Sequence, residues 1–175
     1  MTHNLRARVG PATLAALDKG LCAVCAALIV AFSVMLIAQV ALRQLGEPLF
    51  WIEELCQYLM VYLCFLGTAI AWGRREHLVV DFLPSLLPET PRKVLTFAVD
   101  AIVLMFAAWA AFASAEFALY SMRKVSISLE APVGYGYLGA PVGFAIVALQ
   151  SLIFMVCGPQ GLVLAKQPEL EEVGM

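Results

Sequence analysis

Two adjacent acids near the first third of the chain are its best candidates for contacting another molecule. Glu53 and Glu54 directly follow Phe50 and Trp51. A carboxylate at the start of a helix is favoured by the helix dipole, so the pair could serve only to support a helix. A carboxylate beside an aromatic side chain can also receive a basic group of a partner protein. Both accounts stay open, and the second makes Trp51, Glu53 and Glu54 candidate partner contacts.

A second candidate is the pair His77 and Asp81. Their four-residue spacing places them on one face of a helical turn. Two ligands do not make a metal site, so we expect a helix-supporting contact or a contact with a partner. The sequence contains no phosphate loop, Ser/His/Asp set or zinc motif. We therefore expect no catalytic residue, no metal and no cofactor, and we do not expect an enzyme.

Two further acids, Asp100 and Glu116, lie near the two ends of a long apolar run. Ionisable groups that take part in transport are usually found deep in the membrane, and this chain has none at mid-depth. We interpret Asp100 and Glu116 as members of ion pairs at the level of the membrane interfaces, with a contact to a partner subunit as the alternative. The expected cations are Arg74, Arg75 and Lys93 for the first acid, and Arg43 and Arg123 for the second.

The composition indicates that these residues belong to a membrane protein. Of the 175 residues, 62% are hydrophobic and only 14% are charged, whereas a soluble domain carries roughly a quarter charged residues. Too few charges remain to cover a surface in water. The formal net charge is −2, and no basic stripe is present, which argues against binding to nucleic acid.

Four apolar runs are long enough to cross a bilayer, whose hydrocarbon core needs about 20 residues of helix. The predicted spans are Leu21–Leu42, Leu55–Gly73, Thr96–Tyr120 and Val133–Cys157. The fold class is therefore all-α, an integral membrane protein of four transmembrane helices. A short interfacial segment is expected between the second and third. We predict a tail at 1–20, a membrane domain at 21–157 and a tail at 158–175.

The distribution of Lys and Arg predicts the orientation. Eight of them fall in the two tails and in the loop between spans two and three, and three fall in the other two loops. Because cytoplasmic segments carry the excess of basic residues, both termini are predicted to be cytoplasmic.

Small and polar residues inside the spans predict helix packing. Gly139 and Gly143, and the series Ala107, Ala111 and Ala115, recur every four residues and allow close helix approach. Gln39, Gln57 and Gln150 are expected to form hydrogen bonds between helices. Cys22 and Cys25 are interpreted as small apolar helix residues.

Several segments together resemble the DctQ-type small permeases of tripartite ATP-independent periplasmic (TRAP) transporters. They are 51–59 (WIEELCQYL), 65–67 (FLG), 77–83 (HLVVDFL), 87–88 (LP) and 141–144 (PVGF). The first segment adds Tyr58 to the candidate partner contacts. One departure is the uncharged Val79–Val80, because the family often has a basic residue between the His and the Asp.

The resemblance implies a small, non-catalytic subunit in a bacterial inner membrane. In that family it scaffolds a large permease subunit, which carries the substrate and sodium, and a periplasmic substrate-binding protein delivers the solute, commonly a carboxylate. The alternative is a structural or assembly subunit of another membrane complex.

Overall fold

The structure is a computed structural model, which describes the backbone of residues 2–46, 49–74 and 89–157. Side chains are described for 14–46, 49–74 and 94–156. The helices in these ranges are α1 (Thr2–Gln44), α2 (Phe50–Gly73), α4 (Glu89–Ser121), α5 (Gly134–Tyr137) and α6 (Gly139–Cys157). The described residues form no strand, and one isolated bridge joins Val125 and Pro132. The predicted all-α class is confirmed.

The four predicted spans are also confirmed. Helices long and apolar enough to cross a membrane cover Leu14–Gln44, Phe50–Gly73, Val94–Ser121 and Gly134–Val156. The first of these ranges includes the predicted Leu21–Leu42 and lies within the longer helix α1. The predicted interfacial segment lies within 75–88, outside the described residues, and the division into tails and membrane domain stays a prediction.

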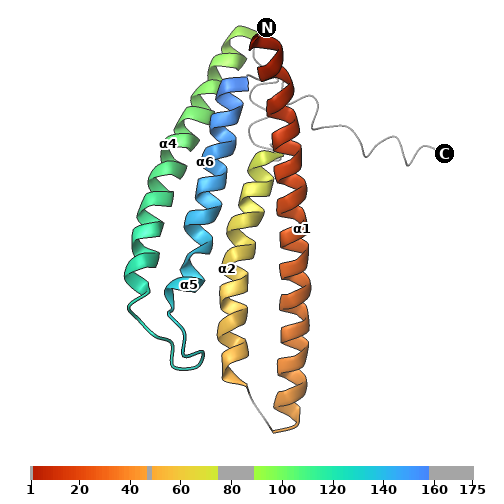
Figure 1. Ribbon diagram of the computed structural model, residues 1–175, viewed down its shortest axis with the longest axis vertical. Coiled ribbons are helices and arrows are strands. Elements are labelled where there is room, and N and C mark those ends of the chain that lie inside the picture. The colour runs from red at the N-terminus through yellow and green to blue at the C-terminus, as the bar shows by residue number, and fades with distance from the viewer. Residues whose placement is uncertain (1, 47–48, 75–88, 158–175) are drawn as a thin grey trace, which may run out of the picture.

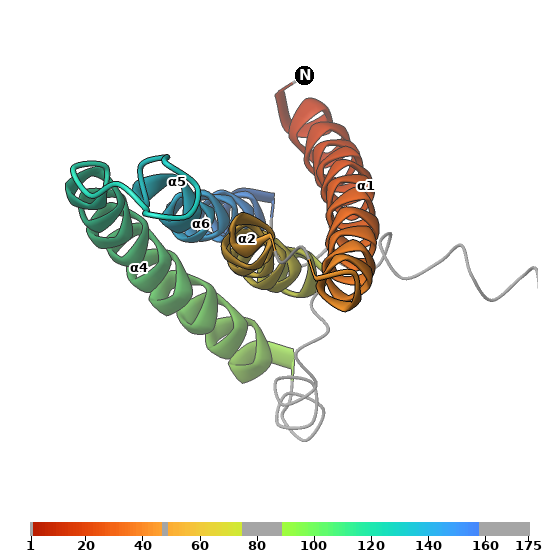
Figure 2. The same ribbon diagram turned by 90° about the horizontal axis from the view of Figure 1, so that it is seen from below.

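The helices stand in a row rather than around a common centre. α4 packs against α6, α6 against α2, and α2 against α1, with a smaller contact between α1 and α6. Seen along the helices, α4 and α1 are the outer members of this row (Figure 2). The turn after α1 and the loop 122–133 lie at one end, called the loop end (Figure 1). The start of α1 and the end of α6 lie at the other, called the termini end.

Glycines of α5 and α6 bring these helices close to α2. A Cβ at Gly139 would lie 3.1 Å from the Cα of Tyr62, and one at Gly143 would lie 2.6 Å from the Cβ of Phe65. A Cβ at Gly73 of α2 would in turn lie 2.7 Å from the Nε2 of Gln150. Positions 62, 65 and 73 of α2 thus face positions 139, 143 and 150 of α6 in the same order, so the two helices run parallel. The close approach predicted from the α6 glycines is therefore found within this chain.

The series of alanines in α4, expected to pack within this chain or against another one, is buried only in part within this chain. Among the described side chains of α4, the buried alanines are Ala107, Ala110 and Ala118, whereas Ala111 and Ala115 are half-buried. A strict four-residue spacing drifts around a helix of 3.6 residues per turn, so it cannot follow one neighbour over several turns.

The last span is broken between α5 and α6 at Leu138. Pro141 has no backbone N–H to donate to the carbonyl four residues earlier, and its ring crowds that carbonyl. The helix resumes with a bond from the Val142 N–H to the Leu138 carbonyl, at 3.3 Å. The break turns the four residues of α5 against the loop end of α2, where the candidate contacts lie.

Candidate partner-contact sites

Glu54 is bonded inside the chain. Its Oε1 accepts a hydrogen bond of 2.6 Å from the hydroxyl of Tyr58, one turn further along α2. Its Oε2 accepts a short hydrogen bond from the hydroxyl of Ser126, in the loop between α4 and α5. The carboxylate therefore joins the start of α2 to a loop 72 residues away. Both of its oxygens therefore accept from side-chain hydroxyls.

Ser126 organises the loop 122–133 that Glu54 holds. Its hydroxyl oxygen accepts bonds from the N–H groups of Ser128 and Leu129, at 3.2 and 3.3 Å. Its own N–H donates to the Ala131 carbonyl at 3.0 Å, and its carbonyl accepts from the Glu130 N–H at 3.1 Å. The loop is thus a compact turn anchored to α2 through one side chain. Nothing in the sequence pattern singled out Ser126, since a serine in a polar loop is common.

A second bond ties α5 to α2 beside this turn. The hydroxyl of Tyr62 donates to the Tyr135 carbonyl at 2.8 Å. The loop end of the chain is therefore held by side chains of α2 at two successive turns, through Tyr58 with Glu54 and through Tyr62.

Glu53 and Trp51 differ from Glu54, because both are exposed at the loop end. Glu53 lies in the first turn of α2, where the helix dipole favours a carboxylate. The described residues include no hydrogen bond or ion pair of the Glu53 side chain. Of the two adjacent acids, Glu53 is the one placed to meet another molecule, and its partner role stays a prediction.

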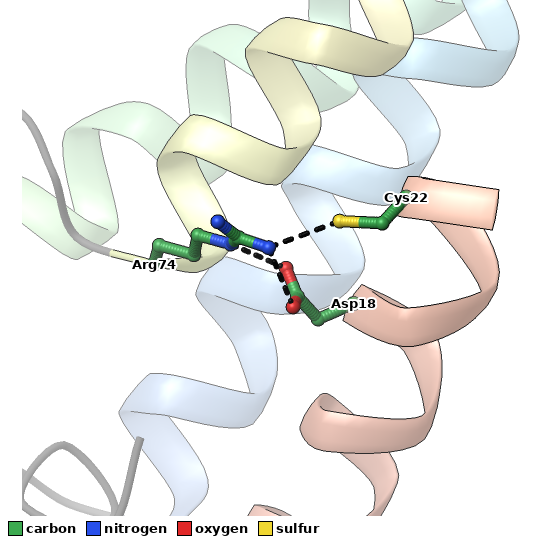
Figure 3. A network of polar contacts seen from close by, with 3 residues as sticks. All are labelled: Asp18, Cys22 and Arg74. Carbon is green, nitrogen blue, oxygen red and sulfur yellow. Dashed lines mark hydrogen bonds and ion pairs between the residues drawn. The ribbon is translucent and has the colours of Figure 1, made fainter. Parts of the chain in front are cut away.

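At the termini end, α1 and α2 are joined by an ion pair. The guanidinium of Arg74 donates two parallel hydrogen bonds to the Asp18 carboxylate, at 3.0 and 3.1 Å (Figure 3). A third N–H bond reaches the Cys22 sulfur at 3.0 Å. Asp18 and Cys22 are one turn apart on α1, so Arg74 closes over both. Arg74 was predicted at this level, but Asp18 was missed, because it stands in the segment predicted to be a tail.

Asp100 is buried, at 3% exposure, whereas its expected place was an ion pair at the interface. The sequence indicates how far along a helix a residue lies, but not whether its face meets lipid or a neighbouring helix. Asp100 stands on α4, which begins at Glu89. Its expected ion pair stays a prediction.

Glu116 and Arg43 are exposed. Arg43 is on α1 and Glu116 on α4, the outer members of the row. The part of the chain with described side chains contains no ion pair of Glu116 with Arg43 or Arg123. Their role as interface-level ion pairs stays a prediction.

His77 and Asp81 lie outside the described residues, and their predicted contact stays a prediction. Within the described residues there is no group of three or more metal-binding side chains. Cys22 and Cys25 are free thiols. Beside them, between α1 and α2, runs an apolar groove of about 400 Å³, lined by Cys25, Ile29, Leu63, Gly67, Ile70 and Ala71.

The family comparison covers most of this architecture. The family model described as "Tripartite ATP-independent periplasmic transporters, DctQ component" matches residues 32–160, which include α2, α4, α5 and α6 whole and the last third of α1. The chain belongs to the DctQ family. The resemblance noted in the sequence is confirmed, and so is its consequence that this is a multi-pass membrane component of a TRAP transporter.

Three curated relatives agree with this family. The sialic acid TRAP transporter permease protein SiaT of Haemophilus influenzae is 40% identical over 79 residues, which are 45% of this chain and 13% of SiaT. The sialic acid TRAP transporter small permease protein SiaQ of Vibrio cholerae is 38% identical over 61 residues, 35% of each chain. A putative TRAP transporter small permease protein of Haemophilus influenzae is 28% identical over 90 residues, 51% of this chain and 56% of the relative. The matches thus span between about an eighth and just over half of these relatives.

Proposed function

We propose that this DctQ chain is the small, non-catalytic membrane subunit of a TRAP-type secondary transporter. It scaffolds a large permease subunit during sodium-coupled uptake of a periplasmic solute. A periplasmic substrate-binding protein delivers the solute to the assembled permease. The family match over residues 32–160 carries this proposal.

The polar contacts of the chain suit a scaffold. Glu54 ties α2 to the loop 122–133, and Arg74 ties α2 to α1. The indole N–H of Trp72 donates to the Ser151 hydroxyl at 2.9 Å, in a buried contact between α2 and α6. Each of these contacts joins two segments of the chain through α2. Such non-covalent contacts favour a subunit that stays rigid while its partner changes conformation.

The relatives support a large partner and an acidic substrate. SiaT is a permease protein of which the matched residues make up only 13%, so a segment like this chain can occur within a much longer permease polypeptide. SiaT and SiaQ are both named for sialic acid, which is a sugar acid. We propose a carboxylate as the solute of this transporter also, and a sugar acid as the first to test.

We place the chain in the bacterial inner membrane with both termini in the cytoplasm. The eight Lys and Arg in the two predicted tails and in the segment between spans two and three, against three in the other two loops, support this orientation. Reporter fusions after Met175 and within 44–50 test it. A periplasmic C-terminus would overturn the orientation.

Co-purification tests the function. The tagged full chain is expressed in its native host membrane and isolated in mild detergent. We expect a large permease to be recovered in a fixed ratio, and to be identified by mass spectrometry. A structural subunit of another complex would instead bring down chains unrelated to TRAP permeases, and that result would overturn the proposal.

A further inference from the structure

Most of the residues that α2 leaves exposed lie on one face. Beyond the first turn they are Gln57, Met60, Cys64 and Thr68, spaced by three or four residues. This spacing keeps them on one side of a helix, and Glu53 lies on the same side one turn nearer the loop end. We call these five residues the α2 face. The other sides of α2 pack against α1 and α6.

The α2 face differs in composition from the exposed sides of the outer helices. Of the five residues of the α2 face only Met60 is a large hydrophobic one, and Phe50 and Trp51 in the first turn of α2 are also exposed, at 69% and 40%. The exposed large hydrophobic residues of α1 include Ile29, Val30, Val34, Ile37 and Val40, and those of α4 include Ile102, Met105, Phe106, Trp109 and Phe112. Lipid offers no hydrogen bonds, so a surface in contact with lipid is expected to be apolar. The α1 and α4 sides fit that expectation, whereas the α2 face does not.

Gln57 is a polar residue of the α2 face whose side-chain amide has no hydrogen-bond partner in the described part of the chain. It stands seven residues inside α2, about 10 Å from the start of the helix. Thr68, by contrast, donates to the Cys64 carbonyl at 2.9 Å. An amide at the depth of Gln57 gains most from a neighbouring helix that can bond to it.

Gly67 borders the α2 face and lines the apolar groove between α1 and α2. A Cβ at Gly67 would meet nothing within 4 Å, whereas one at Gly143 would collide with Phe65. The packing of this chain therefore explains why residue 143 is a glycine, but it does not explain why residue 67 is one. A glycine inside a helix is less stable than an alanine there. The room that Gly67 leaves is open to a molecule outside the chain, about 15 Å along α2 from the unbonded amide of Gln57.

We propose that the α2 face is the docking surface for a transmembrane helix of the large permease, and that this helix enters the groove beside Gly67. The identity of the partner rests on the proposed function. The partner helix brings a small or aliphatic side chain against Gly67 and a hydrogen-bonding group opposite Gln57. At the loop end it brings a basic group to the exposed carboxylate of Glu53.

Two other occupants fit the observations less well. A lipid acyl chain can fill the groove, but it leaves the Gln57 amide without a hydrogen bond. A second copy of this chain in the same membrane would be related by an axis along the membrane normal, so equal residues would meet at equal depth. That arrangement would bring the two Glu53 carboxylates together, and like charges at such a contact repel.

The test uses Gly67→Leu with Ala108→Leu as its matched control. A Cβ at position 67 meets nothing within 4 Å, so Leu there can extend into the groove. Ala108 is an exposed residue of α4, at a side with the composition expected for lipid. We expect Gly67→Leu to lower the large permease recovered per small subunit at least about tenfold. Ala108→Leu should match the wild type. Gln57→Leu should lower recovery in the same direction, although it makes α2 more apolar.

Thermal unfolding of each isolated variant in detergent is measured alongside and should show that Gly67→Leu remains folded. Wild-type recovery of the permease with Gly67→Leu would overturn the docking surface and leave the proposed function standing. A wild-type chain that recovers no permease would overturn the proposed function itself. Unchanged recovery with loss of bound phospholipid would identify a lipid groove, and loss of self-association alone would identify a dimer contact. Either result would overturn the proposal.

Discussion

The hydroxyl of Ser126 donates a hydrogen bond to the carboxylate of Glu54, which stands 72 residues earlier in the chain. This bond joins the second turn of α2 to the turn that connects α4 with α5. The same carboxylate also accepts from Tyr58. Both of its oxygens are therefore engaged within the chain, while the adjacent Glu53 is exposed. The two acids look equivalent in the sequence, but their surroundings assign them different tasks.

Removing either end of this bond should loosen the loop 122–133. We expect Glu54→Ala and Ser126→Ala to speed amide hydrogen exchange severalfold at Ser126–Ala131, because these amides lie in the turn that the bond anchors. Glu53→Ala is the matched control and should leave the loop unchanged. Equal exchange in the wild type and all three variants would show that the Glu54–Ser126 bond does not hold the loop.

Substitution by alanine should change the free energy of unfolding in opposite directions at Gly143 and at Gly67. At Gly143 the new methyl group would meet Phe65 at 2.6 Å, and overpacking of this kind costs about 1–3 kcal/mol. At Gly67 it would meet nothing, so the isolated chain should become more stable by about 0.4–1 kcal/mol. Unfolding of the isolated variants in detergent measures both. A Gly67→Ala chain as unstable as Gly143→Ala would contradict this packing of α2.

Trp72 should matter more to stability than the equally large Trp109. Its indole N–H bonds to Ser151 in a buried contact between α2 and α6, whereas Trp109 is 68% exposed on α4. Trp72→Phe removes the donor and keeps an aromatic ring, for an expected loss of about 1 kcal/mol. Trp109→Phe is the control. Equal unfolding free energies for the two variants would argue against the Trp72–Ser151 bond.

The ion pair of Arg74 with Asp18 should show only a modest coupling. The two side chains are 44% and 31% exposed, and pairs accessible to water contribute about 0.2–1 kcal/mol. A double-mutant cycle with Asp18→Asn and Arg74→Gln isolates the pair from other contacts of either residue. Coupling indistinguishable from zero would mean that the pair does not fasten α1 to α2.

The sequence was sufficient to predict the number of spans, since an uninterrupted run of about 20 apolar residues is typical of a transmembrane helix. It was harder to predict which side of each helix packs against another helix of the chain. Gly139 and Gly67 look alike in the sequence, yet of these two only Gly139 packs against another helix of this chain. The burial of Asp100 depends likewise on which side of α4 meets the other helices.

Two polar contacts between segments distant in the sequence were also missed, because they depend on how the helices and loops pack. Ser126 could not be paired with Glu54 from the sequence, because their contact depends on how the loop folds back over α2. Asp18 was missed because the polar start of the chain was interpreted as a tail, whereas α1 begins at Thr2. Periodicity along one helix carries no information on contacts set by the packing of several helices.

The central claim is that this chain assists transport without performing it. The most direct test is solute uptake by proteoliposomes under a sodium gradient, using a panel of carboxylates that includes sialic acid and the binding protein of the same transporter. The account predicts uptake when the chain and its large permease are both present, and none with the chain alone. Uptake by the chain alone, or equal uptake by the large permease without it, would contradict the account.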